Sequence, residues 1–132
     1  MCNVGRAQDF DTCRFMTYNV LNFDNTGNEK EQYLRAVVDS MRPDILVVQE
    51  LIELSGATRF FDSVVYVIDT NYAMGTFINS FDTDNGIYYR KDKFGFISNT
   101  VITTELRDIN QFKLVHLLSN EIVYFYSLHL KA

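Results

Sequence analysis

Three apolar runs in this sequence each lead to a polar side chain that could take part in chemistry. Asn19 lies near the end of the first run, Glu50 directly follows the second, and His129 directly follows the third. A carboxylate can hold a cation, an imidazole can donate a hydrogen bond or transfer a proton, and a carboxamide can bind an anion or water. Because α/β enzymes deliver polar groups to one rim of a sheet, we expect the three side chains to share an edge.

Each of these residues also has a structural explanation that the sequence leaves open. Asn19 could cap a turn where its strand ends, and His129 could be a hydrogen-bonded histidine of the core. Glu50 is costly at the edge of a buried strand unless it is paired or bound to a cation, although it could complement the first turn of a following helix. His116 has no adjacent acid in the sequence and is expected to be structural.

Arg107 is a further candidate for binding an anion. It lies at a predicted strand junction, where a planar guanidinium could clamp a phosphate. A surface ion pair with Asp108 or Glu105 explains this arginine equally well.

Apolar periodicity and turn residues predict the elements that must position these side chains. Residues 14–21 are typical of a strand, and residues 45–48 of a strand buried on both faces. A helix is expected between them over residues 29–41, ended by Arg42-Pro43. The remaining sequence predicts a weaker helix over 51–61, a short strand over 64–68, an ambiguous segment over 72–82, and an antiparallel meander over 86–89, 94–103, 112–118 and 122–128.

This order of elements indicates an α/β (α+β) fold with one mixed, mostly antiparallel sheet and helices on one face. The other face of the sheet is apolar, and we expect it to lack cover within this chain. Residues 1–12 are polar and are expected to form an irregular amino-terminal tail, while residues 13–132 form one globular unit.

Composition limits the classes of protein that this sequence can belong to. With 132 residues that are 47% hydrophobic, it can build one core. A net charge of −5 excludes bulk attraction to a polyanion, so any nucleic-acid contact must be local or mediated by a metal. The two cysteines show no zinc-site spacing, and no run has the length of a membrane span. A signal-peptide pattern is missing, which leaves export after signal removal and a cytoplasmic location both open.

Three motifs, in order, resemble the endonuclease/exonuclease/phosphatase superfamily, which includes pancreatic-type deoxyribonucleases, abasic-site nucleases, neutral sphingomyelinases and inositol-polyphosphate phosphatases. They are residues 17–22, 43–50 and 127–132, with the sequences Thr-Tyr-Asn-Val-Leu-Asn, Pro-Asp-Ile-Leu-Val-Val-Gln-Glu and Ser-Leu-His-Leu-Lys-Ala. Any one of them is weak, and their common order makes the match strong. The resemblance covers about residues 14–132 and implies half of a four-layer α/β sandwich.

The resemblance also implies roles for individual residues. Glu50 matches the principal ligand of Mg²⁺ or Mn²⁺, and Asn19 matches an asparagine that helps hold phosphate and metal-bound water. His129 matches the first of two family histidines, which supports the scissile phosphate as a hydrogen-bonding group or general acid. Arg107 more loosely matches a phosphate-contacting arginine. Strand order makes Asp84 the candidate acid that orients His129, although Asp-Asn-Gly is also typical of a turn.

Two family segments are missing from this sequence. Gly-Asp-Phe-Asn and Ser-Asp-His, the second of which carries the water-activating histidine, would both follow Ala132. We therefore expect the domain to be truncated after His129: an inactive fragment of a metal-dependent phosphodiesterase, lacking its carboxyl-terminal half. Its substrate would be a phosphodiester, either a nucleic acid or a phospholipid-type headgroup. The alternative is a non-catalytic fragment or binding module that forms a homodimer through its uncovered sheet face.

Overall fold

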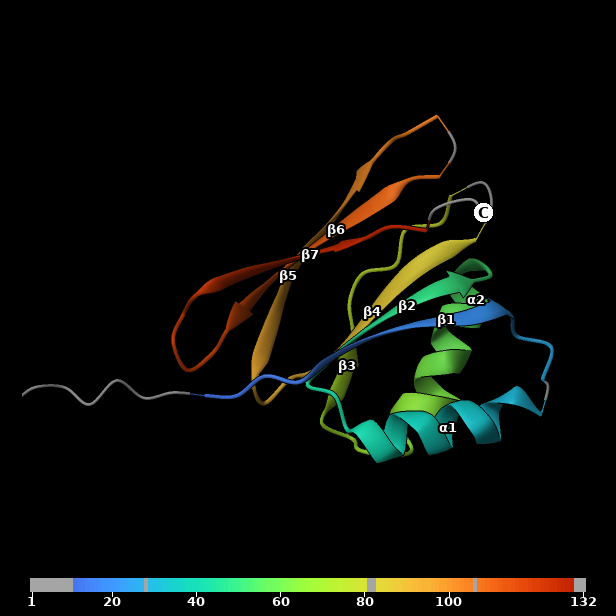
Figure 1. Cartoon of the computed structure of the whole chain (residues 1–132), viewed down its shortest axis with the longest axis horizontal. Coiled ribbons are helices and arrows are strands. Elements are labelled where there is room, and N and C mark those ends of the chain that lie inside the picture. The colour runs from blue at the N-terminus through green and yellow to red at the C-terminus, as the bar shows by residue number, and fades with distance from the viewer. Residues whose placement is uncertain (1–10, 28, 81–82, 106, 130–132) are drawn as a thin grey trace, which may run out of the picture.

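The computed structural model describes residues 11–27, 29–80, 83–105 and 107–129, which form three layers (Figure 1). A helical layer covers one side of a mixed sheet, and a second, antiparallel sheet covers the other side. The α/β (α+β) class predicted from the sequence is confirmed. Within the described residues, no helix is long and apolar enough to span a membrane.

The first sheet contains the two strands that lead to Asn19 and Glu50. Its strand order is β1-β2-β4-β3, where β1 is Phe15–Phe23, β2 is Ile45–Leu51, β3 is Tyr72–Met74 and β4 is Asp84–Arg90. Strands β1 and β2 are parallel, whereas β4 is antiparallel to both β2 and β3. Parallel pairing brings the carboxyl ends of β1 and β2 to the same edge.

The helical layer packs on one face of this sheet. It consists of α1 (Lys30–Met41), α2 (Glu53–Phe60) and the π-helix η1 (Phe61–Val65). Leu34 and Val38 of α1 and Phe60 of α2 join a buried cluster with Val48 and Tyr88 of the sheet. The predicted placement of helices on one face is therefore correct.

The predicted strand over residues 64–68 is wrong. Val64 and Val65 belong to the π-helix, which continues directly from α2, and both are buried in the same core cluster. A short apolar run has the same composition in a buried helix as in a buried strand, so periodicity could not separate the two.

The second sheet corrects the prediction of a single sheet with an uncovered face. It has the order β5-β6-β7, formed by Phe94–Ile102, Ile109–His116 and Ile122–Ser127. Its inward side chains Phe94, Phe112 and Leu114 pack against Ile45, Val47 and Ile87 of the first sheet. Strand β4 has β2 on one side and β3 on the other, so β5 finds no free edge there and begins a new sheet.

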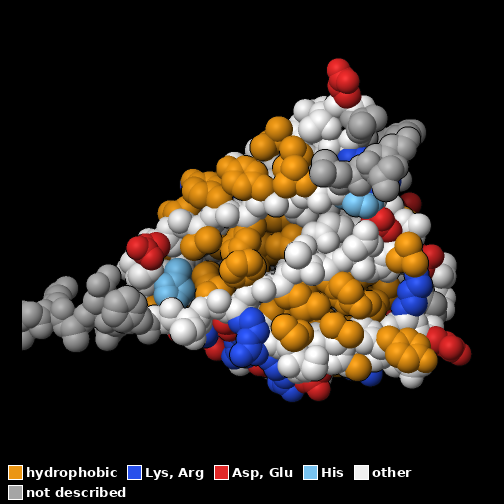
Figure 2. All heavy atoms as spheres, viewed as in Figure 1, with side chains coloured by type: hydrophobic (Ala, Val, Ile, Leu, Met, Phe, Trp, Pro, Cys, Tyr) orange, Lys and Arg blue, Asp and Glu red, His pale blue; other side chains and the backbone are white. Residues whose placement is uncertain are grey.

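Of the four edge strands among the described residues, β1 and β7 lie next to each other. Among the described residues, β1 pairs only with β2 and β7 only with β6. Phe15 on β1 is 69% exposed and makes an edge-to-face contact with Phe125 on β7, with 6.1 Å between ring centroids. Figure 2 shows hydrophobic side chains at the surface between the two sheets. Unpaired edges beside apolar side chains are places where another polypeptide can add a strand.

Gly56 in α2 allows this helix to approach the end of β1 closely. A Cβ at this position would lie 2.6 Å from the backbone oxygen of Phe23. Alanine is favoured over glycine inside a helix by about 1 kcal/mol, but this clash with backbone is overpacking, which costs about 1–3 kcal/mol. Gly56→Ala is therefore expected to lower the free energy of unfolding in urea titrations.

Thr58→Ala provides the matched control for this prediction, because Thr58 is an exposed position of the same helix. Helix propensity alone should stabilise that variant by about 0.5 kcal/mol. Stabilisation by both substitutions would show that α2 does not approach β1 as closely as described.

Candidate active site

Irregular backbone at the ends of β1 and β2 creates the site. The register of the β1/β2 pair shifts between Asn19 and Phe23, and that of β2/β4 shifts between Val48 and Leu51. Within these shifts, Leu21, Asn22 and Glu50 adopt left-handed backbone, with φ of 53°, 53° and 63°. Such conformations are disfavoured for residues other than glycine and cluster at functional sites, where bulges redirect side chains.

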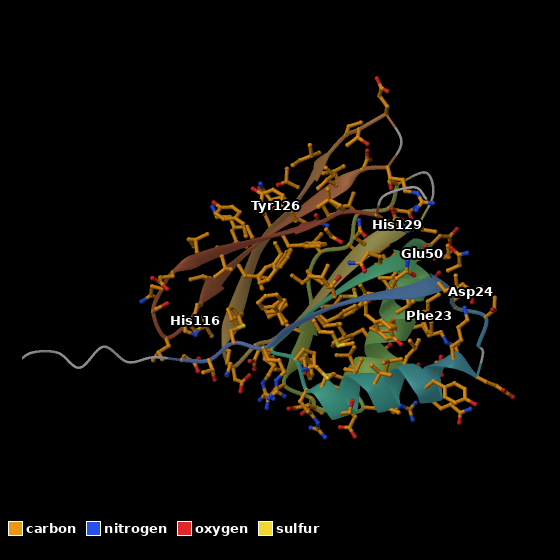
Figure 3. All side chains as sticks on the ribbon, viewed as in Figure 1. Phe23, Asp24, Glu50, His116, Tyr126 and His129 are labelled. Atoms are coloured by element: carbon orange, nitrogen blue, oxygen red, sulfur yellow. The ribbon has the colours of Figure 1, made fainter. Side chains whose placement is uncertain are left out.

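The Glu50 carboxylate is at the centre of the site. Its Oε1 accepts a hydrogen bond from Asn19 Nδ2 at 3.0 Å and lies 3.1 Å from His129 Nε2, while its Oε2 accepts from the backbone N–H of Asn22 at 3.2 Å. The side chains of Glu50 and His129 are 13% and 21% exposed, so solvent reaches both. The structure thus brings together the three residues that we expected to share an edge. Figure 3 shows Glu50 and His129 close to each other.

His129 lies between Glu50 and Arg107. Arg107 Nη1 contacts His129 Nδ1 and lies 3.1 Å from Nε2. A guanidinium can only donate, so Nδ1 accepts from Arg107, and the tautomer that satisfies both neighbours carries its proton on Nε2, facing Glu50. Arg107, a predicted phosphate contact, is therefore placed at the site beside the imidazole.

Asp84 lies beside the end of β2, where it is the register partner of Leu51. It is 3% exposed, and its Oδ1 accepts hydrogen bonds from the backbone N–H of Ser80 at 2.9 Å and from Ser80 Oγ at 2.5 Å. The carboxylate within 3.1 Å of His129 is that of Glu50. The role of Asp84 in orienting His129 stays a prediction.

Gln49 and Asn22 were not identified from the sequence as site residues. Gln49 is 9% exposed, and its Nε2 donates to Thr17 Oγ1 at 2.8 Å and to Ser127 Oγ at 3.2 Å. A carboxamide next to Glu50 in an otherwise apolar strand was the available signal, because a buried amide needs partners. Asn22 acts through its backbone N–H, for which side-chain type carries no signal.

The other histidine, His116, lies at the opposite end of the second sheet (Figure 3). Its Nδ1 lies 2.9 Å from Ser119 Oγ and its Nε2 lies 3.0 Å from Asp11 Oδ2. These contacts attach residue 11 to the hairpin between β6 and β7, which is a structural role.

The attachment of Asp11 should depend on pH. The hydrogen bond from His116 holds the pKa of Asp11 below its ordinary value of 3.8, and Lys93 adds a smaller effect in the same direction. Ionised Asp11 therefore stabilises the fold above pH 3.8, and this contribution is lost as the pH falls through the lower folded-state pKa. Near neutral pH, the urea concentration at the midpoint of unfolding should be lower for Asp11→Asn than for the wild type. In acid, the two midpoints should become equal.

A double variant isolates this contact from other acid-sensitive groups. In a His116→Gln background, Asp11→Asn should have a smaller effect on the urea midpoint near neutral pH. If Asp11→Asn changes the urea midpoint equally with and without His116→Gln, groups other than His116 lower the pKa of Asp11.

The donors at the site fit a weakly held, largely hydrated divalent cation. A carboxylate offers about four lone-pair positions, and the contacts from Asn19, His129 and Asn22 engage three of those on Glu50, leaving one on Oε2. Mg²⁺ is commonly bound by one or two carboxylates together with water and substrate phosphate. Among the described residues, there is no cluster of three or more His, Cys, Asp or Glu that could enclose a metal.

The layered arrangement of the described residues is similar to that of several solved structures. D. rerio TDP2 complexed with a single-strand DNA product matches with a TM-score of 0.67 and 21% identity, over 91% of this chain and 46% of that chain. The human Nocturnin catalytic domain with a bound sulfate anion matches with a TM-score of 0.63 and 17% identity, over 91% of this chain and 51% of that chain. AP endonuclease LMAP from Leishmania major matches with a TM-score of 0.56 and 14% identity, over 89% of this chain and 40% of that chain.

These solved structures all belong to the superfamily, so the predicted resemblance is confirmed for the fold. The chain spans about half the length of these structures. No family model and no curated protein matches the sequence.

Proposed function

We propose that these residues form part of a divalent-metal-dependent hydrolase that cleaves phosphodiester bonds. The observation that carries the proposal is that Asn19 and His129 both lie within hydrogen-bond distance of the Glu50 carboxylate, at an edge of the sheet that solvent reaches. Acidic, amide and imidazole groups at such an edge can bind a cation and a phosphate at the same time.

Each side chain has a distinct task in this proposal. Glu50 binds Mg²⁺ or Mn²⁺, which when present neutralises phosphate charge and polarises the scissile ester. Asn19, oriented by its bond to Glu50, binds phosphate oxygen or water through its amide. When substrate is bound, His129 redirects its Nε2 proton from Glu50 to the phosphate or the leaving oxygen, and Arg107 binds the same phosphate beside it. Asp84 supports this edge of the sheet.

The phosphodiester is proposed to be a nucleic acid in preference to a phospholipid-type headgroup. One neighbour is complexed with a single-strand DNA product and another is an AP endonuclease, and these descriptions favour the first class. A net charge of −5 means that binding would depend on contacts at the site and not on bulk attraction.

We expect the 132 residues alone to turn over little substrate. Glu50 is a single carboxylate, and residues outside the described part of the chain would be needed to complete the metal site and to activate water. Since the chain spans about half of its structural neighbours, a carboxyl-terminal half is the proposed source of those residues.

A phosphodiesterase assay tests this function. Bis(p-nitrophenyl) phosphate would be incubated with Mg²⁺ or Mn²⁺ and either this chain or the chain extended by the residues encoded after Ala132. Metal-dependent hydrolysis by the extended chain, abolished by EDTA, is the expected result. Equal inactivity of both chains would contradict the enzyme proposal.

A second candidate function is self-association without catalysis. Open edges on β1 and β7, together with exposed Phe15, favour it. Size-exclusion chromatography with light scattering should then give a dimer that Phe15→Ser weakens. A monodisperse monomer at high concentration would exclude this candidate.

A further inference from the structure

Gln49 ties together the three strands that lead to the site residues. Its Nε2 donates one hydrogen bond to Thr17 on β1 and another to Ser127 on β7, while Gln49 itself belongs to β2. Thr17 precedes Asn19 by two residues, Gln49 directly precedes Glu50, and Ser127 precedes His129 by two residues. One side-chain nitrogen therefore connects the three strands that lead to Asn19, Glu50 and His129.

The bond to Ser127 matters most because it crosses between the sheets. Strands β1 and β2 are already held by their own backbone ladder, but β2 and β7 belong to different sheets. Nothing in the backbone pairing therefore sets the position of His129 relative to Glu50. A second cross-sheet amide bond, from Asn85 Nδ2 to Asn110 Oδ1 at 2.8 Å, joins β4 to β6 instead.

The bridge lies close enough to control the imidazole. Two residues of extended chain span about 7 Å, so little backbone freedom separates Ser127 from His129. Gln49 and Ser127 are 9% and 2% exposed, which protects their bond from competition by water.

We propose that Gln49 is a positioning residue, which holds His129 against Glu50 through its hydrogen bond to Ser127. This inference deepens the proposed function and rests on it. Gln49 is not proposed to touch substrate; it acts by fixing the separation of two groups that do. Loss of the bridge should free the His129 ring while leaving Glu50 in place on β2.

The test is an NMR measurement without metal or substrate, so that its outcome does not depend on activity. Exchange of the His129 Nε2 proton with water is measured in the wild type, Ser127→Ala and Gln49→Leu. We expect exchange to accelerate at least tenfold in both variants. Ser127→Thr keeps the hydroxyl that accepts from Gln49, so exchange should stay as slow as in the wild type. Asn85→Ala breaks the other cross-sheet amide bond, and exchange should stay slow in this variant as well.

His116 provides an internal control, since its contacts with Asp11 and Ser119 lie at the far end of the sheet. Its resonances should remain unchanged in all variants. Slow exchange in Ser127→Ala and Gln49→Leu would overturn the positioning role, and so would equal acceleration in Asn85→Ala, which would indicate general loosening. If Mn²⁺ does not bind the wild type, that result counts against the proposed function. The exchange rate of the His129 Nε2 proton would still test the positioning role, because it is measured without metal.

Discussion

Replacing Glu50 with glutamine is expected to weaken Mn²⁺ binding by about a hundredfold or more. Loss of an outer-shell partner alone commonly costs about 10–100-fold in metal affinity, and Glu50 is the proposed direct ligand. Glutamine keeps the length of the side chain and its hydrogen-bonding oxygen but removes the negative charge. Titration of Mn²⁺ followed by the electron paramagnetic resonance signal of the free ion measures the affinity. In a chain that turns over phosphodiesters, the same substitution should reduce kcat by about a thousandfold.

Glu53→Gln is the matched control for Glu50→Gln. Glu53 also adopts left-handed backbone, with φ of 57° against 63° for Glu50, and it is exposed three residues further along the chain. The control removes the same unit of charge from the same region but should change Mn²⁺ affinity less than twofold, because exposed charges are screened by solvent and salt. If both substitutions weaken Mn²⁺ binding equally, the binding depends on the net charge of this region and not on a site at Glu50.

Truncating Phe112 to alanine is expected to destabilise the protein by about 3–5 kcal/mol. Phe112 on β6 is fully buried against Ile45, Val47 and Ile87, so its ring fills the space between the sheets. Removing it leaves a cavity, because each sheet is held by its own backbone hydrogen bonds and the two cannot move close enough together to fill the space. Urea unfolding monitored by circular dichroism gives the change in free energy of unfolding.

Tyr124→Ala tests the same sheet from its outer side. Tyr124 on β7 is 47% exposed, and its described ring contact is with the Lys113 ammonium, 5.6 Å from the ring centroid. Its loss should cost about 1 kcal/mol or less. A Phe112→Ala effect no larger than this would contradict the packing of β5–β7 over the first sheet.

Local sequence predicted most strands but not their assignment to sheets. The alternation of apolar residues along β6 shows that one face is buried, and it carries no information about which surface covers that face. The deciding element was β3, the three-residue strand Tyr72–Met74. It is too short to produce a periodic signal, yet it takes the edge of β4 that β5 would otherwise have joined.

The candidate site was predictable to the extent that it depends on strand ends. Asn19 and Glu50 lie where the regular pairing of two adjacent parallel strands is interrupted, and the apolar runs that lead to them mark this place in the sequence. The left-handed backbone at Glu50 and the bridging amide of Gln49 were not predictable, because both arise from contacts between residues far apart in the chain. The contact of Arg107 with His129 is of the same kind, since it joins two loops 22 positions apart.

Paramagnetic broadening by Mn²⁺ can locate a metal site at Glu50, because the protein has two histidines and they lie in different places (Figure 3). Sub-stoichiometric Mn²⁺ would be added while the ring signals of His129 and His116 and the side-chain amide of Asn19 are followed by NMR. If Glu50 holds the metal, we expect selective broadening of His129 and Asn19, unchanged His116 signals, and loss of the effect in Glu50→Gln. Broadening centred on His116, or no selective broadening of either histidine, would contradict a metal site at Glu50.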